Sequence, residues 1–140
     1  MIDIDKARVM IREALAHGTA EGMKPLAVAV LDAGGHVIAF ERSDGSPPGR
    51  FAVARGKAHG AVMMGMGGRA QSKLAEGRPF FSASLVGAFD GGFVPVPGGV
   101  LVRDGAGAVV GAVGVSGDTS ENDAAAALAG IAAAGFEGEA

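Results

Sequence analysis

Two pairs of short apolar runs, each pair interrupted by a turn rich in glycine, dominate the pattern of the chain. Leu26–Phe40 contains the turn Asp32-Ala33-Gly34-Gly35, and Val100–Val115 repeats the device around Asp104-Gly105-Ala106-Gly107. This pattern predicts two β-hairpins, because glycine tolerates the positive φ that tight hairpin loops require. Strands joined by tight turns are antiparallel.

Three longer segments repeat their apolar residues at helical spacing. They are Asp3–Glu21, Arg50–Met66 and Ser120–Gly135. In the last of them, Ser120 and Asp123 match a capping box. The order of elements predicts an α+β fold, an α-β-α sandwich with a mainly antiparallel sheet, formed by a single domain over residues 1–140.

The segments between these elements give weaker patterns. Arg69–Glu76 predicts a short helix, Pro79–Ala88 is ambiguous but compatible with a helix, and Phe93–Val96 reads as a short extended piece. Gly56 and Gly60 lie four apart in the second long helix, which indicates close approach of another backbone. Residues 136–140 read as a loose tail.

Composition narrows the classes of function. Hydrophobic residues make up 49% of the chain but aromatic residues only 5%, so the predicted core is aliphatic. A net charge of −3 argues against nucleic-acid binding. The absence of cysteine excludes disulfides and thiol-based sites. No apolar run reaches the roughly 20 residues of a membrane span, and the first residues do not resemble a signal peptide. We therefore expect a cytoplasmic protein without a membrane or nucleic-acid partner.

The segment Asp32–Arg42 resembles the GlcG/HbpS family of haem-binding-like proteins, which also forms the C-terminal domain of PduO-type proteins. Three further segments resemble the family in the same order: residues 54–58, 97–100 and 110–117, followed by Asp123. The resemblance implies a profilin-like α-β-α fold and a homo-oligomer. Some relatives bind haem or other tetrapyrroles, and others are encoded beside glycolate or diol metabolism, so the resemblance implies a small-molecule ligand, with haem as the leading cofactor.

Three histidines are available as ligands to haem iron, and the resemblance fixes none of them. His59 is the most ligand-like by its surroundings, although many relatives are expected to have a residue such as threonine there; the alternative is a half-buried helix or interface histidine. His17 is a second candidate axial ligand, or simply a cation at a helix C-terminus. His36 reads as a hairpin residue. The histidine spacing does not predict a zinc or non-haem iron site within one chain.

Two further groups have the chemistry of anion binding. The cations around the start of the second long helix match carboxylates of a small acid or of haem propionates, or else form a solvated face paired with nearby acids; they are Arg42, Arg50, Arg55 and Lys57. Turns with exposed N–H groups occur at Pro97-Gly98-Gly99 and Ser116-Gly117-Asp118. Neither turn matches a Walker or Rossmann motif.

These observations favour a homo-oligomeric protein that binds a planar or acidic small molecule, haem or another tetrapyrrole in the leading case. The predicted site lies between the second long helix and the two turns. It consists of His59, Lys57, Arg42, Gly98, Gly99, Ser116, Gly117 and Asp118. The alternative is an accessory enzyme acting on a small organic acid, with Asp118 or His59 as the acid or base. A structural oligomer without a ligand is a third alternative.

Overall fold

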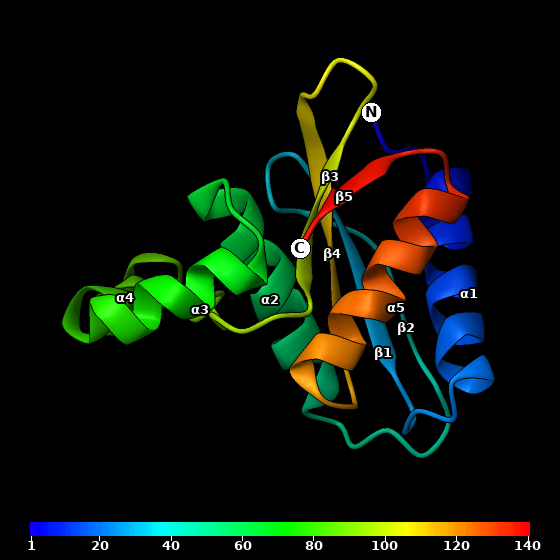
Figure 1. Cartoon of the computed structure of the whole chain (residues 1–140), viewed down its shortest axis with the longest axis horizontal. Coiled ribbons are helices and arrows are strands. Elements are labelled where there is room, and N and C mark those ends of the chain that lie inside the picture. The colour runs from blue at the N-terminus through cyan, green and yellow to red at the C-terminus, as the bar shows by residue number, and fades with distance from the viewer.

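The chain, described over all 140 residues by a computed structural model, forms five helices and one five-stranded sheet (Figure 1). Every strand pair is antiparallel and the strand order is β2-β1-β4-β3-β5. The predicted α+β fold with an antiparallel sheet is confirmed. The elements are α1 (Ile4–Ala20), β1 (Ala27–Asp32), β2 (Val37–Arg42), α2 (Arg50–Met64), α3 (Gly68–Gly77), α4 (Pro79–Ala88), β3 (Gly99–Arg103), β4 (Val109–Ser116), α5 (Ser120–Ala133) and β5 (Glu137–Glu139).

Alternating side chains of the central strands form two cores. In β1, Val28 and Val30 belong to the larger core, which α1 and α5 cover, whereas Ala29 and Leu31 point to the face that α2 covers. Figure 1 shows α1 and α5 together on one side of the sheet and α2 on the other. Successive side chains of a strand point to opposite faces of the sheet, so β1 contributes residues to both cores.

Helix α2 lies close to the sheet because small residues face each other there. Gly114 of β4 lies directly under the carbonyl of Ala54, so a side chain at Gly114 would collide with helix backbone. The predicted close approach of another backbone is present at Gly56, whose carbonyl accepts from the Val94 N–H at 3.3 Å. At Gly60 the close neighbours are side chains instead, and an added Cβ would lie 2.9 Å from the Phe93 ring.

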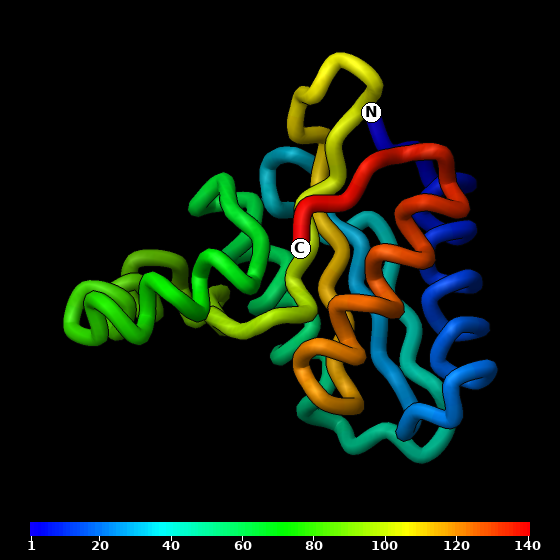
Figure 2. Tube along the Cα trace, in the orientation of Figure 1, coloured from blue at the N-terminus to red at the C-terminus, as the bar shows by residue number.

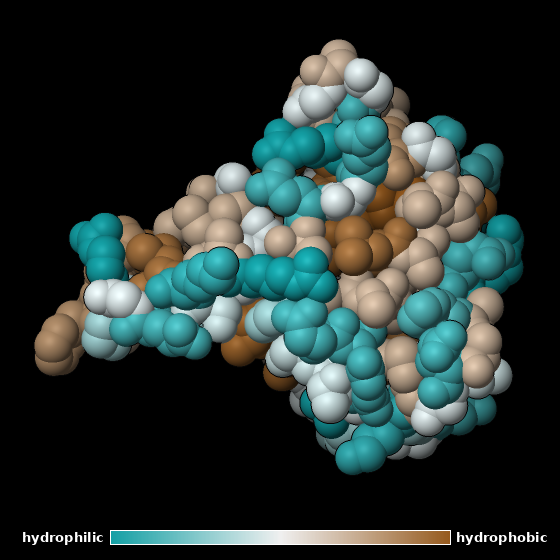
Figure 3. Space-filling model, viewed as in Figure 1, coloured by the Kyte–Doolittle hydropathy of each residue, from teal (hydrophilic) through white to brown (hydrophobic).

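Helices α3 and α4 form an arm that projects from the α2 side of the molecule (Figure 1). The main packing partner of α4 is α3. No residue of α4 is charged, and Phe80 is 93% exposed. The space-filling view shows hydrophobic residues on this arm (Figure 3). The arm therefore exposes apolar surface that the rest of the chain leaves uncovered.

Two local predictions need correction. The C-terminal segment was expected to be loose, but Glu137–Glu139 pairs with β3 as an outer strand (Figure 2). The predicted capping box is absent, because Thr119 caps α5 by accepting from the Asn122 N–H at 3.2 Å while Asp123 turns inward.

No helix of the fold has the length and hydrophobicity needed to cross a lipid bilayer.

Candidate functional site

The residues predicted to share one site lie at separate places along the sheet. His59 lies beside the turn between β1 and β2, since an added Cβ at Gly35 would stand 3.0 Å from its ring. Lys57 lies over β3 and β4, where its ammonium donates to the Val115 carbonyl at 3.0 Å. Arg42 lies at the far end of β2 from Gly35. The structure thus divides the predicted site into separate groups.

The ring of His59 is oriented by one hydrogen bond. Its Nδ1 lies 2.8 Å from the carbonyl oxygen of Gly92, in the loop after α4. A carbonyl can only accept, so Nδ1 must carry the hydrogen, and Nε2 of the neutral ring keeps its lone pair. The same arrangement holds many metal-binding histidines, whose second nitrogen donates to a carbonyl or carboxylate.

Aromatic and thioether side chains surround this imidazole. The Phe89 ring meets it nearly edge-on at 6.3 Å between centroids, and Phe89 in turn packs on Phe93 at 5.9 Å. On the other side, an added Cβ at Gly35 would stand 3.0 Å from Met63 Cε and 3.4 Å from His59 Nε2. The buried Gly35 therefore packs close to the His59 ring and Met63, where a side chain would crowd both. We call His59, Met63, Phe89, Gly92 and Gly35 the His59 cluster.

A cation lies one helical turn before His59. Arg55 is half-buried on α2, and residues four apart are neighbours on a helix surface. Arg55 also lines an open cleft of about 450 Å³ with Phe51 and with Asp90 and Gly91, which adjoin the His59 partner Gly92. A guanidinium that lines a cleft can bind a carboxylate through two parallel hydrogen bonds.

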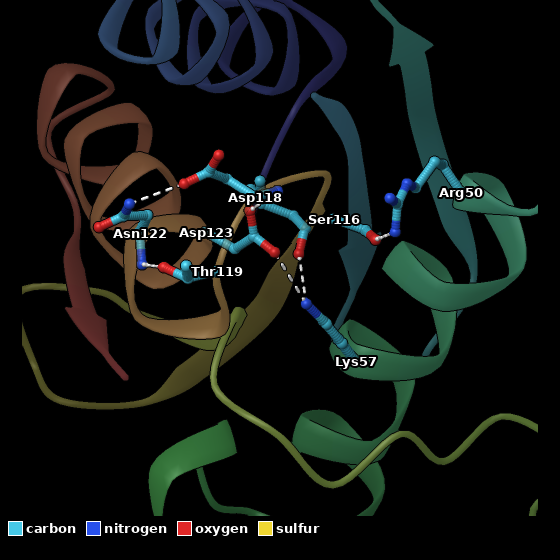
Figure 4. A network of polar contacts seen from close by, with 8 residues as sticks. Arg50, Lys57, Ser116, Asp118, Thr119, Asn122 and Asp123 are labelled. Atoms are coloured by element: carbon cyan, nitrogen blue, oxygen red, sulfur yellow. Dashed lines mark hydrogen bonds and ion pairs between the residues drawn. The ribbon is translucent and has the colours of Figure 1, made fainter. Parts of the chain in front are cut away.

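Lys57 belongs to a buried ion pair (Figure 4). Its side chain is 4% exposed, and its ammonium donates to Oδ2 of Asp123, which is 2% exposed, at 3.1 Å. The other carboxylate oxygen of Asp123 accepts from the Asp118 N–H at 2.9 Å. We call Lys57, Asp123, Val115 and Asp118 the Lys57 network. The network connects α2, β4 and the start of α5. Two of the hydrogen bonds that the Lys57 ammonium can donate are therefore made within the chain.

The predicted glycines lie around this network. An added Cβ at Gly98, which has φ +116°, would stand 2.9 Å from the Lys57 ammonium, and Gly99 packs directly under the Lys57 carbonyl. Gly117 packs in the same way against the Pro25 carbonyl. These glycines permit close packing of the backbone. Gly98 lies in the predicted turn, whereas Gly99 is the first residue of β3, and a direct role of these glycines in ligand binding stays a prediction.

Asp118 is half-buried and holds the β4–α5 turn. Its carboxylate accepts from the Asn122 amide at 2.7 Å and from the Lys24 N–H at 3.2 Å. The hydrogen bond from Asn122, followed by the backbone N–H groups, lowers the pKa of Asp118 below its ordinary value. This carboxylate is therefore a weaker base than an ordinary aspartate, which reduces its fitness as a general base near neutral pH.

The remaining histidines lie apart from His59. The exposed His36 lies 3.2 Å from Asp32, whose pKa is lowered chiefly by the backbone N–H of His36. His17 is half-buried near the end of α1 and lines a different hollow, with Asn122 and Ala125. No three histidine, aspartate or glutamate side chains gather in a group suited to a metal ion.

The architecture is that of a profilin-like α+β protein, with one aromatic-lined histidine on the helix that covers the sheet. The chain belongs to the HbpS-like family: the model of the family described as "Haem degrading protein HbpS-like" matches residues 2–132. No curated protein sequence matches the chain.

Solved structures agree with this assignment. The chain is 27% identical to Streptomyces reticuli HbpS in a double-mutant structure, with a TM-score of 0.80 over 92% of this chain and 84% of that one. PduOC in a haem complex superposes with a TM-score of 0.85 at 23% identity, over 97% and 96% of the two chains. Klebsiella pneumoniae ORFY superposes with a TM-score of 0.84 at 23% identity, over 95% of this chain and 90% of that one. At 23% identity, the similarity to PduOC and to ORFY is evidence for a shared fold alone.

Proposed function

We propose that this protein binds haem or a related planar, acidic tetrapyrrole, with Nε2 of His59 as the ligand to iron. The observation that carries this proposal is the hydrogen bond from His59 Nδ1 to the Gly92 carbonyl, which fixes the ring and leaves the Nε2 lone pair of the neutral imidazole as the available donor to a metal. Axial imidazole ligands need this tautomer and a fixed ring. Membership of the HbpS-like family supports the same class of ligand.

The surroundings of His59 fit such a ligand. Phe89 and Met63 offer apolar contacts for a macrocycle, and Arg55 offers a guanidinium for a carboxylate at its edge. Because Lys57 is directed at Asp123, we propose Arg55 as the main carboxylate contact. The bound group would supply the redox chemistry of its iron, and the chain would supply orientation, apolar cover and charge.

The experiment is a haem titration followed by visible absorbance on the parent protein and on two histidine variants. We expect a saturable Soret shift at about one haem per chain, lost or weakened at least tenfold in His59→Ala. His17→Ala is the matched control, since that histidine lies outside the His59 cluster, and it should titrate like the parent. A shift that persists in His59→Ala but disappears in His17→Ala would contradict our assignment. No shift in the parent would contradict haem binding itself.

We also propose that the protein assembles as a homo-oligomer through the α3–α4 arm. An uncharged helix with Phe80 almost fully exposed and Val86 45% exposed is unusual for a chain that stays alone in water. A second copy of the chain is the partner that the family resemblance implies.

The arm makes this assembly testable by light scattering after size-exclusion chromatography. We expect the parent to elute as an oligomer and the double variant Phe80→Ser, Val86→Ser to shift at least partly to the monomer, because it removes apolar contact area. Val37→Ser is the control, since Val37 is 43% exposed but lies on β2, far from the arm in the fold. A parent that is monomeric at high concentration would contradict the proposal.

A further inference from the structure

One end of the sheet gathers cationic and hydroxyl side chains beneath the first turn of α2. Arg42 and Ser116 both pair with Ala27, one from each side of β1. Residues directly opposite one another in an antiparallel sheet point to the same face. That face is the one covered by α2, because Ala29, two residues further along β1, packs against Ala54 and Ala58 of that helix.

Several donors at this end have no acceptor within the chain. Arg50, the first residue of α2, donates from one terminal nitrogen to the Ser116 hydroxyl at 3.3 Å (Figure 4), while its Nε is shielded from solvent and unpartnered. Ser116 is 1% exposed, and its hydroxyl accepts from Arg50 without donating to any residue. The hydroxyl of Ser46, in the loop before α2, is also shielded and unpartnered.

The backbone adds positive potential at the same place. The N-cap of α2 is Gly49, which provides no capping side chain, and the first turn of this 15-residue helix contains no acidic residue. Free N–H groups and the helix dipole therefore favour an anion here.

Glu41, Asp44 and Asp123 do not neutralise this region. Glu41 pairs with Val28 and so points to the opposite face of the sheet, and Asp123 is engaged with Lys57. Asp44 lines a hollow with Lys24 and Leu15 near α1. Arg42 and Arg50 take part in no ion pair within the chain.

We propose that Arg42, Arg50, Ser46, Ser116 and the N-terminus of α2 form a binding site for a small oxyanion, a carboxylate or phosphate group. A shielded donor without an acceptor costs free energy, and an oxyanion accepts from several donors at once. Phe40 and Phe51, stacked at 4.7 Å between centroids, provide apolar surface beside it for a short carbon chain. This site is separate from the His59 cluster and does not depend on haem binding.

Isothermal titration calorimetry at low ionic strength, with inorganic phosphate and with malonate as separate probes, tests this site. We expect at least one probe to bind the parent, and Arg50→Gln and Arg42→Gln each to weaken its affinity about tenfold, since each removes a charge-assisted hydrogen bond. Arg103→Gln is the control, because Arg103 lies at the opposite end of β3 and pairs with Glu139. It should bind like the parent.

The two probes distinguish the sources of the oxyanion. Phosphate binding alone would indicate a phosphorylated ligand, and malonate binding would indicate an organic acid; either supports the site when the arginine variants weaken it. Absence of binding with both probes, or equal affinity in the parent and both arginine variants, would overturn it. Urea denaturation of each variant checks that the fold is intact. His59→Ala should keep anion binding, and Arg42→Gln should keep any Soret shift, so that failure of one site is distinguishable from failure of the other.

Discussion

Replacing Asp123 by alanine should lower the free energy of unfolding by about 3–5 kcal/mol, the usual effect of removing one partner from a buried ion pair. The substitution leaves the 4% exposed Lys57 ammonium with only the Val115 carbonyl as acceptor, and it removes the acceptor of the Asp118 N–H. Urea denaturation of the parent and the variant measures the difference.

Two further variants make this prediction specific. Glu121→Ala is the matched control, since Glu121 also lies in the first turn of α5 and pairs with Arg69, but at the surface; it should change stability far less. The double variant Lys57→Met, Asp123→Leu should recover part of the lost stability, because an apolar pair leaves no buried charge without a partner. A loss below about 1 kcal/mol in Asp123→Ala would show that the ion pair is not buried as described.

The second large effect is expected at Gly114, where a single methyl group should cost about 3 kcal/mol, the upper range for overpacking. The added Cβ of Gly114→Ala would collide with the Ala54 carbonyl, which is helix backbone and has no rotamer through which to move away. Helix α2 must then rise from β4, which loosens the core that holds His59. Urea denaturation measures the cost.

A glycine in open space provides the comparison for this variant. Gly105 lies in the β3–β4 turn with nothing within 4 Å of an added Cβ and without a positive φ, so Gly105→Ala should be nearly neutral. If the two alanine variants had equal stability, the close approach of α2 to β4 would be wrong.

The parts of the fold that the sequence predicted are those with a strong local signal. The hairpin turns at Asp32–Gly35 and Asp104–Gly107 require particular backbone conformations, and both occur where the glycines indicated, with φ +83° at Gly35 and at Gly107. Strand β5 was missed because Glu-Gly-Glu has neither apolar alternation nor β-branched residues. It exists through its hydrogen bonds to β3, and pairing between distant segments leaves no local pattern.

The candidate site was predictable only in part, for a similar reason. The surroundings of His59 in the sequence, with Met63 four residues on, indicated a candidate ligand, but the Gly92 carbonyl comes from a loop 33 residues away. Lys57 was expected to contact a ligand because it belongs to the group of cations around the start of α2, whose charge suits a carboxylate. Its partner Asp123 is 66 residues distant and matched a helix-capping pattern, which concealed the buried ion pair.

The short strand β5 has a consequence for how the molecule behaves at high concentration. An unpaired sheet edge is a template on which another chain can add a strand. This outer edge consists of three exposed residues, two of them the glutamates Glu137 and Glu139, and only Glu139 has a cationic partner, Arg103. If the sheet of a second molecule approached this edge, its backbone would meet the carboxylates of β5. The charged C-terminal segment thus protects the hydrophobic strands β3 and β4 from edge-to-edge aggregation.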